Sequence, residues 1–535
     1  MADEKEYKVI TKKGIDIAEI EAELERDTTS DATVSANVPD RTVDVAYAKK
    51  ANNRITYYML TDAEASELSK DPRIYVVETE PDPKLAKHEP YEIQTAQFDR
   101  STSNDQDAKN WGLYRHIIKE FDSASSSNTY SADYTYSLDG TGVDIVIQDD
   151  GIEPFGHPEW EDAQGNTRFE QIDWYASTGI AGTMPAGHYT NGFSDGNNAG
   201  QHGSHVAGIA AGKTFGWAKN AKIYSLRHYG GSPNQISGAD KFDLIRVWHE
   251  KKPIDPNTGF KRPTIVNQSW GWSAGYPSPI THVFYKGVDQ NITAQSFSTT
   301  AFAQYGMVAN KFPYVNASED VEQEQLTDSG IICVKAAGNY YHPCAGPNAP
   351  YYSGIYDSYF TYSGGDLHYN RPSSPHSDDT IFVANMDREQ FGTEEYITEK
   401  SERGPRIDII AGGVDISSAT SQVSGYPGTQ FYPGSATHKM TRISGTSMAA
   451  PQVSGVGALW LQANPGGTAQ QFKDFLKIHS TANSYDSGTD ESFDDFNTVP
   501  RRYGAPNRIL HWPYNSPNPW GWKGTSGSGT AGINT

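Results

Sequence analysis

The sequence predicts an α/β protein built on a central parallel β-sheet and preceded by a small α+β domain. Two observations support this prediction. Short apolar runs alternate with helical segments through most of the chain, which is typical of parallel strands covered by helices on both faces. Before them, residues 7–80 show strand and helix periods in the order βαββαβ, the pattern of a split βαβ sandwich. A chain of 535 residues can bury a sizeable core.

The N-terminal elements can be justified one by one. Ile17, Ile20 and Leu24 recur at helical spacing. The turn residues KKANN separate two segments that alternate like paired strands. Thr61 and Glu64 form a capping-box pattern, which opens a short second helix. The expected strands are 7–11, 41–48, 54–60 and 73–80, and the expected helices are 15–26 and 61–71.

The larger α/β region contains six apolar runs that we expect to be strands. They are VDIVIQ (143–148), KIYSL (222–226), TIVNQS (264–269), IICVKAA (331–337), TIFVAN (380–385) and IDIIAG (407–412). Long polar stretches without a clear period interrupt this series, and we interpret them as insertions. The predicted division is an N-terminal domain at 1–82, a polar linker at 83–107, an α/β domain at 108–511 with insertions at about 272–318 and 340–379, and a flexible Gly/Ser-rich tail at 512–535.

Composition excludes several classes of function. The 44 Lys and Arg against 66 Asp and Glu give a net charge of −22, which disfavours nucleic acid as a partner. No apolar run approaches the roughly 20 residues of a membrane helix. The N-terminus, MADEKEYKVI, lacks the apolar stretch of a signal peptide, so we expect a cytoplasmic or assembly-associated protein, including a virion component, and not a conventionally secreted one. Cys333 and Cys344 can pair or stay free, and we favour free thiols.

Four segments carry residues suited to acyl transfer. A strand runs into Asp149-Asp150-Gly151, a histidine at 202 opens a small-residue helix, a strand ends at Asn339, and Ser447 stands at the start of another small-residue helix. Each signal alone is weak, because an Asp at a strand end is usually a cap or turn residue, a lone His is usually structural or solvated, and Gly-Thr-Ser and Gly-Asn are common in turns. Together they supply a nucleophile, a base with a pKa near 6.5, a carboxylate to orient that base and an amide for an oxyanion.

These segments resemble the motifs of the subtilisin-like serine proteases, the subtilases. The order Asp…His…Ser is that of subtilisin. The matching motifs are Asp149–Ile152 with His157-Pro158, His202–Gly208, Ala336–Asn339 and Gly445–Pro451, and weaker matches are Asn110–Leu113, Ser269–Gly271, Ser401–Pro405 and Tyr503–Asn507. The resemblance spans about 110–511, and residues 7–80 resemble the family's inhibitory propeptide. It implies a subtilisin-like sandwich fold and a serine endopeptidase.

Residue by residue, the resemblance implies the following roles. Asp149, His202 and Ser447 form the triad, with Asp150 the alternative aspartate, and Asn339 donates to the oxyanion. The implied substrate-binding residues are Gly231, Ser269, Trp270, Gly271, Ala337 and Gly338, with Trp270 narrowing or flooring a specificity pocket. The implied partners are a polypeptide substrate, bound as an added strand, and the protein's own N-terminal domain as an intramolecular inhibitor. His205 is expected to be a packed residue.

The sequence leaves other functions open. The fold could serve as a structural or interaction module, or as an esterase, although the absence of a GxSxG elbow around Ser447 argues against an α/β-hydrolase. The chemistry requires no cofactor and predicts no metal ligand. Structural Ca²⁺ is common among subtilases, and acidic residues follow Asp486, but their spacing matches no EF-hand loop and favours a solvated loop.

Overall fold

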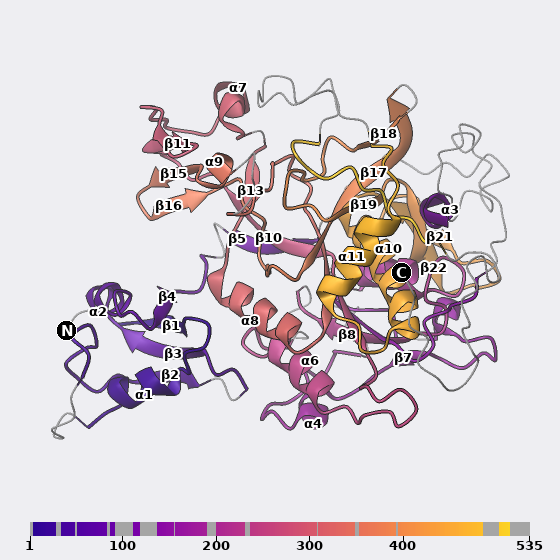
Figure 1. Cartoon of the computed structure of the whole chain (residues 1–535), viewed down its shortest axis with the longest axis horizontal. Coiled ribbons are helices and arrows are strands. Elements are labelled where there is room, and N and C mark those ends of the chain that lie inside the picture. The colour runs from indigo at the N-terminus through magenta and orange to yellow at the C-terminus, as the bar shows by residue number, and fades with distance from the viewer. Residues whose placement is uncertain are drawn as a thin grey trace.

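A computed structural model describes residues 4–27, 34–48, 51–82, 86–90, 111–117, 136–154, 156–189, 200–229, 236–307, 309–347, 353–391, 394–484 and 502–513. The main body of the molecule is an α/β unit, and the N-terminal domain lies beside it with helices α6 (Lys241–Glu250) and α8 (Ala317–Asp328) at the boundary (Figure 1). The predicted flexible tail begins too early at 512, because Trp512 is buried in the main core and its N–H donates to the carbonyl of His116. Residues 514–535 of that tail and the acidic stretch after Asp486 fall outside the described residues.

The N-terminal domain is a four-stranded sheet in the strand order β2-β3-β1-β4, with two helices. Its elements are β1 (Lys5–Thr11), α1 (Ala18–Leu24), β2 (Val45–Ala48), β3 (Ile55–Leu60), α2 (Asp62–Leu68) and β4 (Ile74–Glu78). The order βαββαβ is the one that the sequence periods predict. Thr61 and Glu64 form the expected capping box at the start of α2. One face of the sheet packs against α1 and α2 through residues such as Val9, Ile20 and Leu68.

The central sheet has the order β18-β17-β14-β9-β6-β8-β7, with β19 also paired to β17. All of these pairings are parallel except β17 with β18. The strands are β6 (Asp144–Asp149), β7 (Phe169–Glu170), β8 (Lys222–Arg227), β9 (Thr264–Gln268), β14 (Ile332–Ala336), β17 (Ile381–Phe391), β18 (Glu394–Ile397) and β19 (Ile409–Gly412). All six apolar runs singled out in the sequence form strands of this sheet.

Helices cover both faces of the central sheet, as the apolar runs predict. Ile145 and Ile147 of β6 face a core with α5 and α10, whereas Val146 between them faces a core with α4, α6 and α8. This alternation is the period of a β-strand, so a continuous apolar run is needed to fill both cores. The helices are α3 (Trp111–Ile117), α4 (Trp174–Thr178), α5 (Gln201–Ala211), α6 (Lys241–Glu250), α8 (Ala317–Asp328), α10 (Thr446–Ala463) and α11 (Ala469–His479).

The two long insertions form regular structure together. β11 (His282–Tyr285) of the first pairs antiparallel with β15 (Tyr359–Tyr362) of the second, and β12 (Val288–Asp289) and β16 (Gly365–His368) complete a four-stranded sheet. The short helices α7 (Thr299–Phe302) and α9 (Ser353–Tyr356) lie in the same lobe (Figure 1). Aromatic rings hold it, for example Tyr276 stacked on Phe297 with centroids 4.0 Å apart. The polar composition of these segments did not predict this sheet.

Two smaller sheets complete the fold. β10 (Trp270–Gly275) continues from β9 and is flanked by β13 (Lys311–Pro313) on one side and β5 (Ala86–Pro90) on the other. β20 (Ile416–Thr420), β21 (Gln430–Phe431) and β22 (Lys439–Ile443) form the other sheet, which leads into α10. β5 lies within the predicted linker. Its composition suggested no regular structure, and its pairing with β10 makes it a strand.

Candidate active site

The carboxyl ends of β6, β9 and β14 meet at one edge of the central sheet, because these neighbouring strands are parallel. Asp149 ends β6, Ser269 follows β9, and Asn339 follows β14. Sheet topology alone therefore brings together two of the four segments that the sequence analysis singled out, those of Asp149 and Asn339, and places Ser269 between them.

The structure distinguishes Asp149 from Asp150 by their contacts. His202 Nδ1 donates to Asp149 Oδ1 at 2.7 Å, which leaves Nε2 as the basic nitrogen of the ring. Asp150 instead accepts the backbone N–H groups of His202 and Gly203, and so caps the start of α5. Burial and the neighbouring charge of Asp149 raise the pKa of Asp150 to about 7. The carboxylate that orients the imidazole is that of Asp149.

A glycine lets α5 approach the aspartates closely. A Cβ atom at Gly203 would lie 2.1 Å from the carbonyl oxygen of Gly151, so only glycine fits between the helix and the Asp-Asp-Gly turn. This approach places His202 against Asp149. His205, three residues along α5, is fully buried, and burial lowers its pKa to about 3. It therefore stays neutral, in keeping with the packed residue expected from the sequence.

Ser447 and Ser269 hold each other through two hydrogen bonds. Ser447 Oγ donates to the carbonyl oxygen of Ser269 at 2.7 Å, and Ser269 Oγ donates to the carbonyl oxygen of Ser447 at 2.8 Å. The second bond compensates for Pro451, which lies inside α10 and has no N–H to give to the carbonyl four residues before it. Proline at this position therefore frees the Ser447 carbonyl to anchor the strand end at Ser269.

Asn339 presents a free amide donor beside the serine. Its Oδ1 accepts from the backbone N–H and the hydroxyl of Thr446, at 3.1 and 3.0 Å. Among the described residues its buried Nδ2 has no hydrogen-bond partner. The Ser447 N–H lies in the first turn of α10, where backbone donors lack a partner within the helix. A side-chain donor and a helix N-terminus thus flank Ser447, which suits a developing oxyanion.

Of the residues implied for substrate binding, Gly231 lies outside the described residues, whereas Ser269, Trp270, Gly271, Ala337 and Gly338 are described. The backbone of Trp270 and Gly271 pairs with Pro90 and Glu89 of β5, so the edge expected to receive substrate is occupied by the protein's own chain.

The side chains of this edge are buried. Trp270 stacks on His228 with centroids 3.8 Å apart and donates to the carbonyl of Gln148. The Trp270 ring is therefore packed in the core of the main body. Ala337 is buried, and its N–H donates to the carbonyl of Val383. Gly338 has a φ of +121°, and a Cβ there would meet Glu402 at 2.6 Å.

Two contacts of this site were missed from the sequence. Tyr229 donates to Asp149 Oδ1 at 2.7 Å. Glu402 binds the backbone on both sides of Asn339. Its N–H donates to the carbonyl of Gly338, and its Oε1 accepts from the N–H of Tyr340. Burial raises the pKa of Glu402 well above its usual range. Tyr229 could have been found, since it follows β8, whose parallel neighbour β6 ends at Asp149.

The free face of the N-terminal sheet contacts α6 and α8. Ile10, Ile55 and Tyr57 form an apolar cluster with Val321 of α8. Glu78, at the end of β4, accepts from the N–H of Ser318 in the first turn of α8 at 2.9 Å. These buried contacts hold the domain more firmly than an exposed ion pair such as Lys13–Asp328, because exposed pairs contribute about 0–1 kcal/mol.

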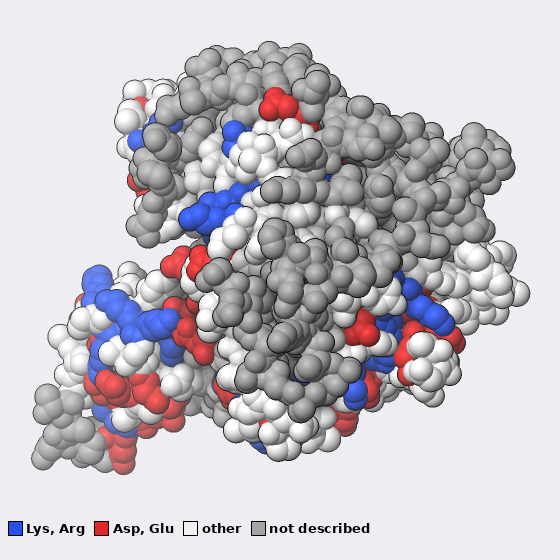
Figure 2. Space-filling model, turned by 45° about the vertical axis from the view of Figure 1, so that its right-hand side comes forward, with Lys and Arg blue, Asp and Glu red and all other residues white. Residues whose placement is uncertain are grey.

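Charged side chains of opposite sign meet at the same boundary. Lys13 and Arg54 of the N-terminal domain pair with Glu324 of α8, and Lys13 also pairs with Asp328. Figure 2 shows basic and acidic side chains gathered where the N-terminal domain contacts the main body.

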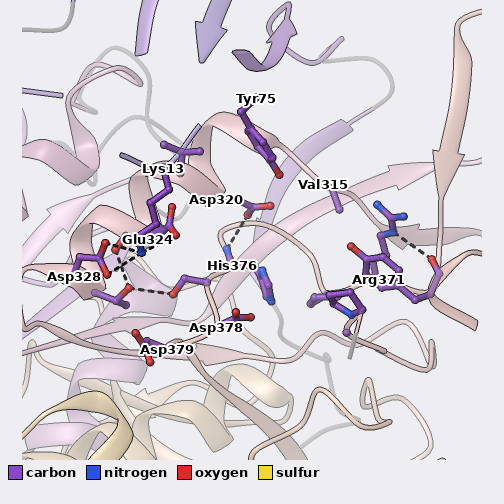
Figure 3. Close-up of a pocket in the computed structure, with 17 residues that line it drawn as sticks. Lys13, Tyr75, Val315, Asp320, Glu324, Asp328, Arg371, His376, Asp378 and Asp379 are labelled. Atoms are coloured by element: carbon purple, nitrogen blue, oxygen red, sulfur yellow. Dashed lines mark hydrogen bonds and ion pairs between the residues drawn. The ribbon is translucent and has the colours of Figure 1, made fainter. Parts of the chain in front are cut away.

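A cavity of about 490 Å³ opens at this boundary. In Figure 3, Lys13 reaches down to Glu324 and Asp328, and Tyr75 lies across from Asp320. Its lining includes none of Asp149, His202 and Ser447, so the cavity is separate from the candidate active site.

The described residues hold no group of three or more His, Cys, Asp or Glu side chains placed to bind a metal. Within the same residues, no helix is both long and apolar enough to span a bilayer. Cys333 and Cys344 are both buried and unpaired.

Comparison with known proteins identifies the group to which these motifs belong. The model of the subtilase family matches residues 140–505. A cuticle-degrading serine protease of Orbilia oligospora is 26% identical over 386 residues, which cover 69% of this chain and 59% of that protein. Subtilisin-like protease 1 of Arthroderma otae is 25% identical over 423 residues, covering 79% and 60%. Subtilisin BL of Lederbergia lenta is 24% identical over 366 residues, covering 67% and 91%.

The chain therefore spans about three fifths of the length of the first two relatives. Among solved structures, fervidolysin from Fervidobacterium pennivorans, described as a keratinolytic enzyme related to subtilisin, matches with a TM-score of 0.50 at 15% identity. The match covers 97% of this chain and 62% of fervidolysin, and it shows a shared fold.

Proposed function

Since the chain belongs to the subtilase family, we propose that it is a serine endopeptidase in which Asp149, His202 and Ser447 form the catalytic triad. The observation that carries the proposal is the 2.7 Å hydrogen bond between His202 Nδ1 and Asp149 at the sheet edge that also holds Ser447. A purely structural role for this buried ion pair would not explain why a serine at a helix N-terminus and an unpaired amide donor lie beside it.

The geometry supports acyl transfer in two steps. His202 Nε2 takes the Ser447 proton as the serine oxygen attacks the substrate carbonyl, and the imidazolium is stabilised by Asp149. In the resting structure the serine hydroxyl donates to Ser269, so it must first turn towards His202. Asn339 Nδ2 and the Ser447 N–H then hold the oxyanion. His202 returns the proton to the leaving amine, and water hydrolyses the acyl-Ser447 ester with the same base.

We further propose that the N-terminal domain inhibits this site within the same chain. β5 runs antiparallel to β10, with Ala86 opposite Ala274 and Pro90 opposite Trp270. β5 thus ends opposite Trp270, which directly follows Ser269, and the Ser269 carbonyl accepts the Ser447 hydroxyl. Such a strand mimics an extended peptide substrate. Because it is tethered to a docked domain, its effective concentration is about millimolar, and it excludes other peptides.

An active-site label tests the assignment of the nucleophile. A fluorophosphonate should modify Ser447 in the chain once the N-terminal domain has been removed, and mass mapping should find the adduct on that residue. His202→Ala should abolish labelling because it removes the base. Ser454→Ala is the matched control, since Ser454 lies on the same helix, is equally buried and donates to Asn267. It should label like wild type. Comparable labelling of several serines would contradict the proposal.

A further inference from the structure

Tyr229 places a hydroxyl on the Asp149–His202 pair. It lies just beyond β8, and the register of β8 with β6 sets Arg227 beside Asp149. The tyrosine hydroxyl donates to Asp149 Oδ1 at 2.7 Å and lies 3.2 Å from His202 Nδ1. Burial beside Asp149 and Asp150 raises the pKa of Tyr229 well above 10. The hydroxyl is therefore a neutral donor throughout the range in which a histidine titrates.

One oxygen of Asp149 carries all of its hydrogen bonds among the described residues. Oδ1 accepts from His202 Nδ1, from the Tyr229 hydroxyl and from the Asp150 N–H, whereas the buried Oδ2 has no partner there. The backbone N–H of Asp150 is the other donor to this oxygen besides the imidazole. Tyr229 adds a side-chain donor to the same oxygen, which helps to hold it towards the imidazole and draws charge away from it.

We propose that Tyr229 is a positioning residue for the Asp149–His202 pair, and that its hydroxyl sets how strongly Asp149 stabilises the protonated imidazole. This inference rests on the proposed function. A donor on Oδ1 makes the carboxylate less basic, so it lowers the affinity of His202 for a proton. Without that donor the imidazolium becomes more stable, and the carboxylate is free to turn its other oxygen towards the ring.

The groups around His202 decide how a pH profile is interpreted. Asp149 and Asp150 face it from the end of β6, Tyr229 from the end of β8, and His205 from its own helix. Tyr426 also faces Tyr229. His205 stays neutral, since its pKa is about 3. Asp150, with a pKa of about 7, titrates in the range that is ordinary for a histidine. The experiment must therefore separate these two groups, which Asp150→Asn achieves.

The test compares Tyr229→Phe with wild type, each produced as the full chain and assayed after the segment between β5 and α3 has been cut. We expect kcat to fall about ten-fold with KM changed less than about two-fold, because positioning acts on the reacting groups and not on substrate binding. We expect the acid limb of the kcat/KM profile to move up by about half a pH unit, and to do so again in an Asp150→Asn background.

Two controls make the result specific. Tyr432→Phe removes a similar tyrosine–carboxylate hydrogen bond, from Tyr432 to Glu159 at 2.7 Å, and should leave the acid limb unchanged. Replacing Tyr229 with 3-fluorotyrosine keeps the ring and strengthens the donor, so the limb should move down. If the wild type is active but neither change at residue 229 moves the acid limb of its pH profile, the inference about Tyr229 is wrong and the proposed function stands. A wild type with no activity and no Ser447 labelling would overturn the proposed function.

Discussion

At the scale of single residues, the oxygen and the nitrogen of the Asn339 side-chain amide have different roles. Thr446 occupies its oxygen, which leaves the Nδ2 donor for an oxyanion. Asn339→Ala should therefore lower kcat by about 10²–10³, or about 2.7–4 kcal/mol of transition-state stabilisation, with little change in KM. Steady-state kinetics on a peptide substrate measure both constants. A raised KM with normal kcat would mean that Asn339 only binds the ground state.

Asp150 gives a pH dependence whose sign follows from its environment. Its folded-state pKa of about 7 lies above the ordinary value of 3.8, so the folded protein binds the extra proton. The stability due to this group is present at low pH and is lost as pH rises through about 7. In a Ser447→Ala chain, Asp150→Asn should raise the melting temperature at pH 8 by about 2 °C or more, and less at pH 4.5. An equal or reversed difference at the two pH values would contradict this.

Residue roles could be predicted only where a local motif carries them. Asp149, His202, Asn339 and Ser447 each stand at a strand end or a helix start with a distinctive neighbourhood, and the structure brings them to one edge. The choice between Asp149 and Asp150 needed the contact with His202. Tyr229 and Glu402 contact residues that lie far away in the sequence, and their local sequence does not specify those contacts. Only the parallel pairing of β8 with β6 indicates that Tyr229 lies near Asp149.

At the scale of elements, the start of α8 is capped by a residue from another domain. Glu78 of β4 accepts from the N–H of Ser318, but burial raises its pKa, so desolvation outweighs the attraction of the helix terminus for a charge. We expect Glu78→Ala to weaken docking of the N-terminal domain about ten-fold, because a buried donor loses its acceptor. Glu78→Gln keeps an uncharged acceptor and should dock as well as wild type at pH 8.

The measurement is the time course of activity after the linker is cut. A weaker complex releases the N-terminal domain sooner, so Glu78→Ala should shorten the lag before peptide hydrolysis, and Glu78→Gln should not. Equal lags in all three proteins would show that the Glu78 cap does not contribute to docking.

A strand could be predicted from the sequence where burial requires one or both of its faces to be apolar. The six runs of the central sheet meet that condition, and each forms a strand. β5 and the sheet of the insertions do not meet it, because their strands exist through pairing with distant partners. β11 and β15 come from separate insertions, and β5 is defined by β10. Local periodicity cannot report such pairings.

At the scale of the whole molecule, the chain contains both a candidate protease and a segment placed on its substrate edge. Docking through α6 and α8 brings β4 to the point from which β5 continues to β10. β5 ends with Pro90 opposite Trp270, the residue that directly follows Ser269 in the chain. Self-cleavage is therefore expected close after β5, within residues 91–95, and not evenly along the polar segment.

The most direct test of the central claim is the intact mass and N-terminal sequence of the wild-type protein beside Ser447→Ala. The claim is that Ser447 is a nucleophile that cuts its own blocking strand. The wild type should begin within residues 91–95 and carry the N-terminal fragment as a separate species, whereas Ser447→Ala should stay at full length. A Ser447→Ala chain cut at the same bond, or a full-length wild type that freely hydrolyses peptides, would contradict the account.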